Sequence, residues 1–155
     1  MAPRSECRDA PRLGRHVGAA TGWLFNWNAS AADALAIWNG YLDFIPASSV
    51  SSPMVAQVSG DGLSSTFFSN TIFGDGFGPG VLAVTVVLQT GPTSGVTDEA
   101  DVVVNSAYNF DSYRGPQQPG TYDFHRIVLH EFGHVHGLGH NDQPPLGTKI
   151  SPARS

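Results

Sequence analysis

The sequence contains little or none of what marks several common protein classes. Cys7 is the only cysteine among 155 residues, which excludes a scaffold held together by disulfides. Charged residues make up 14% of the chain and hydrophobic residues 41%, a balance that argues against intrinsic disorder of the whole chain. No apolar run approaches the roughly 18 residues that a membrane helix requires, so no membrane span is expected. The length favours a single domain, at about 150 residues per domain.

Basic residues are missing from most of the chain. Lysine and arginine are absent between His16 and Tyr113, and four of the eight basic residues lie within the first fifteen positions. The same central stretch carries eight acidic residues. Nucleic-acid binding requires a basic surface, so no nucleic-acid partner is expected. An acidic body suits cations, although a solvated acidic surface accounts for most of these carboxylates.

The chain divides into a short arm and one domain. Residues 1–18 are rich in Arg, Pro and Ala and show no periodicity, which predicts a disordered arm. No apolar segment follows its arginines, so no signal peptide is visible in this chain. Residues 19–155 are predicted to form the domain, with a strand, a helix, four strands and a second helix at 20–26, 31–45, 54–58, 65–73, 81–89, 101–105 and 124–136. This order predicts an α+β fold with helices packed on a mixed sheet.

Histidine is concentrated near the C-terminal end, where five of the six histidines fall within 125–140. Asp123 can cap a helix in this segment, and Gly137 can end it. Residues four apart on a helix share one face, so His130 and His134 can bind the same metal ion. Imidazole nitrogens suit zinc, which they bind at about 2.0–2.1 Å.

A third ligand must come from beyond the helix. Gly137 can adopt a positive φ and reverse the chain, which would return His140 to the metal, whereas His136 points away from this face. Three neutral imidazoles leave an open fourth position, at which zinc lowers the pKa of a bound water to about 7. Glu131 follows the first histidine, turned by about 100° beside the metal. It would accept the proton of the water and later deliver it to the leaving amine.

The segment His-Glu-Phe-Gly-His-x-x-Gly-Leu-Gly-His, from His130 to His140, resembles the zinc signature of the metzincin metalloproteases, and its wording is most similar to that of the matrixin branch. The helix around Trp38, the turn at 79–83 and the segment 101–105 resemble further parts of the family. The resemblance implies a zincin-like α+β fold, with a twisted five-stranded, mostly parallel sheet, one antiparallel edge strand and two long helices.

The resemblance further implies a metalloendopeptidase that hydrolyses peptide bonds through a zinc-bound water activated by Glu131. Its single catalytic zinc ion would be bound by His130, His134 and His140. An extended peptide or protein substrate would pair with the edge strand at Val81, Leu82, Ala83 and Val84. Because metzincin relatives usually work outside the cell, an extracellular location is expected. No feature of the sequence predicts the oligomeric state.

Four acidic residues suggest a second cation site. Carboxylates and loop carbonyls can form an oxygen cage for Ca²⁺, and comparable residues of matrixins bind calcium. The candidates in this chain are Asp75, Asp98, Glu99 and Asp101. Solvated carboxylates in turns are the alternative, because the spacing fits no single calcium-loop motif.

Three features depart from the matrixin pattern. Metzincins carry a methionine in a turn beneath the zinc, but no methionine follows His140. The chain ends fifteen residues after His140, so we expect the domain to lack most of the C-terminal subdomain that forms the specificity pocket. No histidine lies between His16 and His125, which removes the second, structural zinc of many matrixins.

These departures leave a second hypothesis open, a non-catalytic zinc-binding relic or truncated fragment that acts as an interaction module. Glu131 favours the enzyme, because a purely structural zinc site has no need of a neighbouring carboxylate. Cys7 lies in the arm, but the residues around it do not reproduce the switch motif with which matrixin propeptides silence their zinc. We therefore expect Cys7 to be an exposed thiol without a role in latency.

Overall fold

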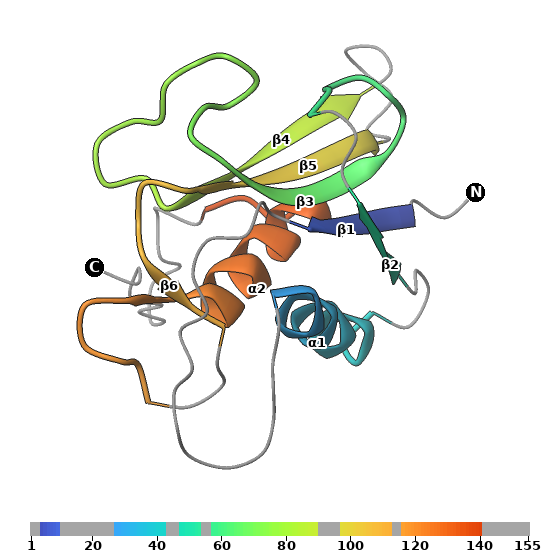
Figure 1. Ribbon diagram of the computed structural model, residues 1–155. Coiled ribbons are helices and arrows are strands. Elements are labelled where there is room, and N and C mark those ends of the chain that lie inside the picture. Colours follow the sequence, from blue (N-terminus) through green and yellow to red (C-terminus); the bar gives the residue numbers. More distant parts are fainter. Residues whose placement is uncertain are drawn as a thin grey trace, which may run out of the picture.

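The computed structural model describes residues 4–9, 27–42, 47–53, 57–89, 97–112 and 116–140. Within these residues two helices, α1 (Trp27–Asn39) and α2 (Phe124–Val135), pack on one side of a β-sheet (Figure 1). The strands are β1 (Arg4–Asp9), β2 (Ser48–Pro53), β3 (Ser64–Ser69), β4 (Ala83–Gln89), β5 (Thr97–Asn105), β6 (Phe110–Asp111) and β7 (Tyr122–Asp123). The α+β class predicted from the sequence is confirmed. Neither helix has the length and apolar character that crossing a membrane requires.

The main sheet has the strand order β2-β1-β3-β5-β4 (Figure 1). β3 and β5 are parallel, and β4 runs antiparallel to β5 at the sheet edge. β1 pairs with β2 along six residue pairs but with β3 along only three. The expected five-stranded, mostly parallel sheet with one antiparallel edge strand is present only in part, because a three-stranded mixed sheet, β3-β5-β4, joins the parallel pair β1-β2 through only three residue pairs. β6 and β7 form a separate two-stranded parallel sheet.

The N-terminal part of the chain differs from the sequence prediction. Arg4–Asp9, assigned to a disordered arm, forms β1, and its backbone pairs with a strand on either side. β2 is not among the predicted strands, because its serine-rich sequence lacks apolar alternation. The predicted strand at 20–26 lies outside the described residues, as does the segment 141–155, where the methionine turn and pocket wall of metzincins would fall.

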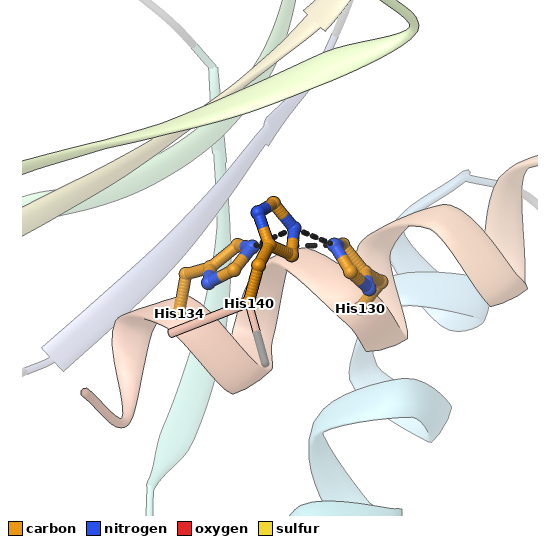
Figure 2. A group of neighbouring side chains, drawn as sticks. All are labelled: His130, His134 and His140. Carbon is orange, nitrogen blue, oxygen red and sulfur yellow. Dashed lines mark hydrogen bonds between the residues drawn. The ribbon is translucent and has the colours of Figure 1, made fainter. Parts of the chain in front are cut away.

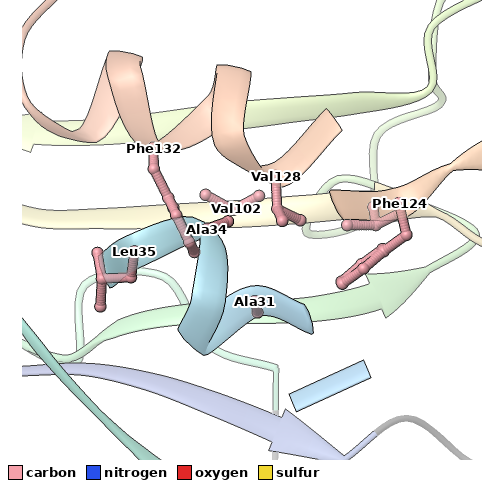
Figure 3. Close-up of a cluster of buried hydrophobic side chains, with 8 residues drawn as sticks. Ala31, Ala34, Leu35, Val102, Phe124, Val128 and Phe132 are labelled. Carbon is pink, nitrogen blue, oxygen red and sulfur yellow. The ribbon is translucent and has the colours of Figure 1, made fainter. Parts of the chain in front are cut away.

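The hydrophobic core lies between the two helices and β5 (Figure 3). It contains the buried side chains of Ala31, Ala34, Leu35, Val102, Val104, Phe124, Val128 and Phe132. The small alanine side chains of α1 let α2 approach closely, so the ridges of the two helices can interlock. The buried face of α2 is thereby fixed against α1 and β5, and this fixes the direction of every other side chain on the helix.

Two polar contacts also tie α2 to α1. Trp38 Nε1 donates to the carbonyl oxygen of Leu129 at 2.7 Å, and His125 Nε2 lies 2.7 Å from Asp33 Oδ2. A Cβ atom on Gly133 would lie 3.1 Å from the Trp38 ring, so the glycine allows the indole to lie against α2. His125, for which the sequence suggested no role, is therefore a structural contact between the helices.

Candidate metal centre

α2 begins and ends where the sequence predicts. Asp123 caps its N-terminus, where Oδ1 accepts a hydrogen bond from the backbone N–H of Arg126 at 3.2 Å. Gly137, the predicted end of the helix, has a φ of 86°. This left-handed conformation is readily adopted only by glycine among common residues, so the chain can leave the helix axis at this point.

The turn after α2 brings the third histidine back to the helix. The backbone N–H groups of Gly137 and Leu138 donate to the carbonyl oxygens of His134 and Gly133, at 2.9 and 3.0 Å. This pair of hydrogen bonds forms a Schellman motif, in which the left-handed residue reverses the chain and satisfies the last helical carbonyls. His140 follows within three residues and faces the helix again (Figure 2).

The Nε2 atoms of three histidines converge at one point (Figure 2). The Nε2–Nε2 distances are 3.2 Å between His130 and His134, 3.0 Å between His130 and His140, and 3.1 Å between His134 and His140. Within the described part of the chain, no other set of three His, Cys, Asp or Glu residues brings its ligand atoms within 4.8 Å of one another. We refer to these three residues as the histidine triad.

The spacing of the histidine triad fits a metal ion. A tetrahedral zinc ion at about 2.0–2.1 Å from each nitrogen holds neighbouring nitrogens about 3.3 Å apart, close to the distances in the triad. Hydrogen bonds between the rings account for the cluster less well, because a neutral imidazole has a single N–H group. When the three Nε2 atoms face one point, their lone pairs are directed toward one another. One divalent ion would satisfy all three lone pairs at once.

The turn also fixes the tautomer of one ligand. His134 Nδ1 lies 2.6 Å from the carbonyl oxygen of Leu138, and a carbonyl can only accept a hydrogen bond. Nδ1 therefore carries a proton, which leaves the Nε2 lone pair of the neutral ring directed into the triad. Partial burial lowers the pKa of His130 below its usual value; Glu131 opposes this shift, and the neighbouring histidines add to it. The neutral imidazole is the form that binds a metal.

Glu131, the predicted general base, is 7% exposed and contacts the edge strand. Thr85 Oγ1, on β4, lies 2.6 Å from Glu131 Oε2 and 3.1 Å from the carbonyl oxygen of the same residue. Nothing in the sequence pattern pointed to Thr85, because 46 positions separate it from Glu131.

His136 does not join the triad, in agreement with its predicted direction on the helix. Its ring packs against Trp38, with 5.7 Å between the ring centroids. Its Nε2 atom is buried and has no hydrogen-bond partner among the described residues, and burial lowers the pKa of the ring. His136 is therefore part of the contact between the helices rather than a ligand.

Two of the four residues predicted to pair with substrate precede β4. The backbone N–H of Asn105 donates to the carbonyl oxygen of Leu82 at 2.8 Å, and Asn105 Nδ2 donates to the carbonyl oxygen of Val81 at 2.9 Å. Both carbonyls are therefore turned toward β5. They are not available to an incoming peptide on the other side.

The register of β4 decides which of its residues face the free edge. Ala83 lies opposite Val104. The neighbouring hydrogen bond of the ladder joins the backbone N–H of Asn105 to the carbonyl oxygen of Leu82, the residue before Ala83. The pair is therefore of the non-hydrogen-bonded kind, so the N–H and C=O of Ala83 point away from β5. Thr85, two residues further on, has the same orientation, whereas Val84 faces β5. Among the described strands β4 pairs only with β5, so Ala83 and Thr85 line its free edge.

The four predicted calcium ligands do not form one cluster. Asp75 pairs through its backbone with Ile72 in an exposed turn, and Asp98 is exposed. Glu99 and Asp101 are each 1% exposed and lie in β5. Within the described residues these carboxylates do not bring three ligand atoms together.

Glu99 and Asp101, which we call the acidic pair, bind backbone amides instead. The two carboxylate oxygens of Glu99 accept from the N–H groups of Gly60 and Gly62, at 2.6 Å each, and Asp101 Oδ1 accepts from Ser65 N at 2.9 Å. Asp101 Oδ2 is buried and has no partner among the described residues. Burial raises the pKa of Asp101 to about 7, against the lowering effect of the Ser65 hydrogen bond, and Glu99 raises it further. The acidic pair thus holds a loop against β5.

The chain matches no protein-family model, no curated protein and no solved structure. The metzincin resemblance therefore rests on the sequence alone, chiefly on that of the segment from His130 to His140. The geometry of the structure establishes a site of three histidines that can hold a metal ion. The function has to be inferred from the chemistry of this site and of its neighbours.

Proposed function

We propose that this protein is a zinc-dependent endopeptidase of the metzincin type, which acts outside the cell on peptides or proteins in extended conformation. The observation that carries the proposal is the convergence of three imidazole Nε2 atoms, with the buried carboxylate of Glu131 on the residue that follows His130. His130 and His140 are exposed, so a fourth ligand and a substrate can approach from solvent. Three neutral nitrogen ligands with an open position are typical of catalytic zinc, whereas structural zinc sites are closed by four protein ligands.

Glu131 is proposed to move the protons of the reaction. A bound zinc ion would supply a Lewis acid that lowers the pKa of a water ligand to about 7 and polarises the scissile carbonyl. Glu131 Oε1 would accept a proton from the attacking water as the new carbon–oxygen bond forms. The same carboxyl group would then deliver this proton to the amine nitrogen as the carbon–nitrogen bond breaks. The carboxylate returns to its starting state, so each turnover consumes one water and one peptide bond and releases a carboxylic acid and an amine.

The free edge of β4 is proposed to hold the substrate. A peptide in extended conformation can add to this edge as a further strand and bond to the outward N–H and C=O groups of Ala83 and Thr85. Val81, Leu82 and Val84 would contribute through side chains or by shaping the strand, because their carbonyls or ladder groups face β5. Main-chain pairing positions many sequences alike, which suits an endopeptidase of broad preference.

The test combines a metal count with hydrolysis of a broad library of fluorescence-quenched peptides. We expect one zinc ion per chain, cleavage that a chelator abolishes and added zinc restores, and a rate lowered about 100-fold or more in Glu131→Gln, because general-base catalysis contributes about 10²–10⁴-fold. Glu131→Gln keeps the size of the side chain and should retain its zinc. Asp61→Asn, which changes an exposed loop carboxylate and keeps the Oδ1 acceptor for the backbone N–H of Leu63, is the matched control and should cleave at the wild-type rate.

Two outcomes would overturn the proposal. If Glu131→Gln cleaves as fast as the wild type, Glu131 is not the general base. Zinc-loaded wild type that cleaves no peptide of the library would instead support the second hypothesis, a non-catalytic zinc-binding module.

A further inference from the structure

We propose that Thr85 is a positioning residue, which orients the carboxylate of Glu131 through its side chain while its main chain pairs with the peptide. The inference rests on the proposed peptidase function. The two roles meet in one residue because β4 is both the edge of the sheet and the strand that covers α2 next to the histidine triad.

The side chain of Thr85 is bound to one particular oxygen of the carboxylate. Its Oγ1 lies 2.6 Å from Glu131 Oε2 and 3.1 Å from the backbone carbonyl oxygen of Glu131. A hydroxyl has a single proton to donate, and the shorter contact, to a charged acceptor, is the stronger one. Oε2 is thereby occupied, and the carboxylate presents Oε1 for proton transfer. Because threonine is branched at Cβ, its χ1 is restricted, so the strand backbone sets the position of the hydroxyl.

The main-chain N–H and C=O of Thr85 face the free edge of the same strand. In the register of β4 its N–H and C=O point away from β5, toward the edge at which a peptide would add. Two bonds, Cα–Cβ and Cβ–Oγ1, join the hydroxyl oxygen to the Cα atom that carries these main-chain groups. A peptide that fixes the backbone of Thr85 therefore also fixes the donor that holds Glu131. Pairing of the substrate with β4 and orientation of the Glu131 carboxylate are therefore coupled. Such coupling positions the reacting groups before the chemical step.

The variants Thr85→Val and Thr85→Ser separate this role from packing. Valine has nearly the shape of threonine but no hydroxyl, so Oε2 of the buried carboxylate would lose its donor. Serine keeps the hydroxyl and gives up the methyl group. Thr121→Val is the matched control, because the hydroxyl of Thr121 bonds to the Gln118 carbonyl within its own turn. If Thr85→Val does not fold, Thr85→Ala takes its place.

In the peptide assay we expect kcat of Thr85→Val to fall about tenfold to a hundredfold, the size expected for a lost hydrogen bond to a charged group. KM and the zinc content should stay within about twofold of the wild type, since neither main-chain pairing nor the triad is altered. Thr85→Ser should recover most of kcat, and Thr121→Val should match the wild type. The carboxyl ¹³C resonance of Glu131, recorded with and without zinc, should move in Thr85→Val and return in Thr85→Ser.

The outcomes distinguish this inference from the proposed function. If Glu131→Gln is inactive while Thr85→Val keeps the wild-type kcat, the positioning role is wrong and the peptidase proposal stands. If the wild type cleaves nothing, the peptidase proposal is wrong, and the resonance then decides on Thr85. A carboxyl resonance that is the same in the wild type and in Thr85→Val overturns the contact, whereas a shift that serine reverses supports it.

Discussion

The histidine triad and the acidic pair are two clusters of titratable side chains with opposite surroundings. The Nε2 atoms of the triad face one another, and two of its three side chains are exposed. The acidic pair is buried, and three of its four carboxylate oxygens accept backbone N–H groups. Both clusters consist of residue types that bind metals. Only the triad has lone pairs that converge and are not already used, so the capacity to bind a metal follows from free lone pairs rather than from composition.

The largest expected difference between the clusters concerns metal affinity. His140→Ala removes one of three ligands and should weaken zinc binding by more than about 100-fold, since changes to groups behind the ligands alone cost about 10–100-fold. Glu99→Gln should leave zinc affinity unchanged. Competition with a chromophoric chelator measures both affinities. If His140→Ala and the wild type bind zinc equally well, the histidine triad is not the zinc site, and the contrast with the acidic pair is wrong.

The pH dependence of stability gives the next largest effect. Burial raises the pKa of Asp101 to about 7 in the folded protein, above the ordinary value of about 3.9 in the unfolded chain. Protonated Asp101 is therefore favoured by folding, so the free energy of unfolding is lowered as pH rises from about 4 through 7.

Asp101→Asn should abolish this dependence, because asparagine keeps the acceptor for Ser65 and places an N–H donor toward Glu99. At pH 8 the variant should be more stable than the wild type by about 1–3 kcal/mol, and near pH 4 the two should be similar. Urea unfolding of the metal-free protein at both pH values measures this. A stability gain that is the same at pH 4 and pH 8 would contradict the proposed protonation.

The smallest effect concerns the turn that completes the triad. Gly137 has a φ of 86°, and a Cβ atom there would meet nothing within 4 Å, so Gly137→Ala introduces backbone strain without a clash. We expect a loss of about 1 kcal/mol in stability and a loss of several-fold in zinc affinity, because the turn returns His140 to the helix. Gly137→Asn is the control, since asparagine tolerates the left-handed region better. Its losses should be smaller than those of alanine, and the reverse order would rule out strain as the cause.

The features that could be predicted from the sequence are those that depend on near neighbours in the chain. The cap at Asp123, the end of the helix at Gly137 and the shared face of His130 and His134 all follow from helix geometry over a few residues. The antiparallel edge strand came with the family resemblance. β1 was missed because pairing of Arg4–Asp9 depends on strands far along the chain, and its own sequence has no apolar alternation.

The sequence by itself determined which residues could meet at a metal, because positions four apart on a helix and a glycine turn fix three imidazoles locally. Only the tertiary structure decided which polar groups stay available. Contacts from 36 to 46 positions away engage Glu99, Asp101 and Glu131 through Gly60, Ser65 and Thr85. Such contacts depend on how β3, β4 and β5 pack on one another and on α2, and short-range periodicity carries no information about that packing.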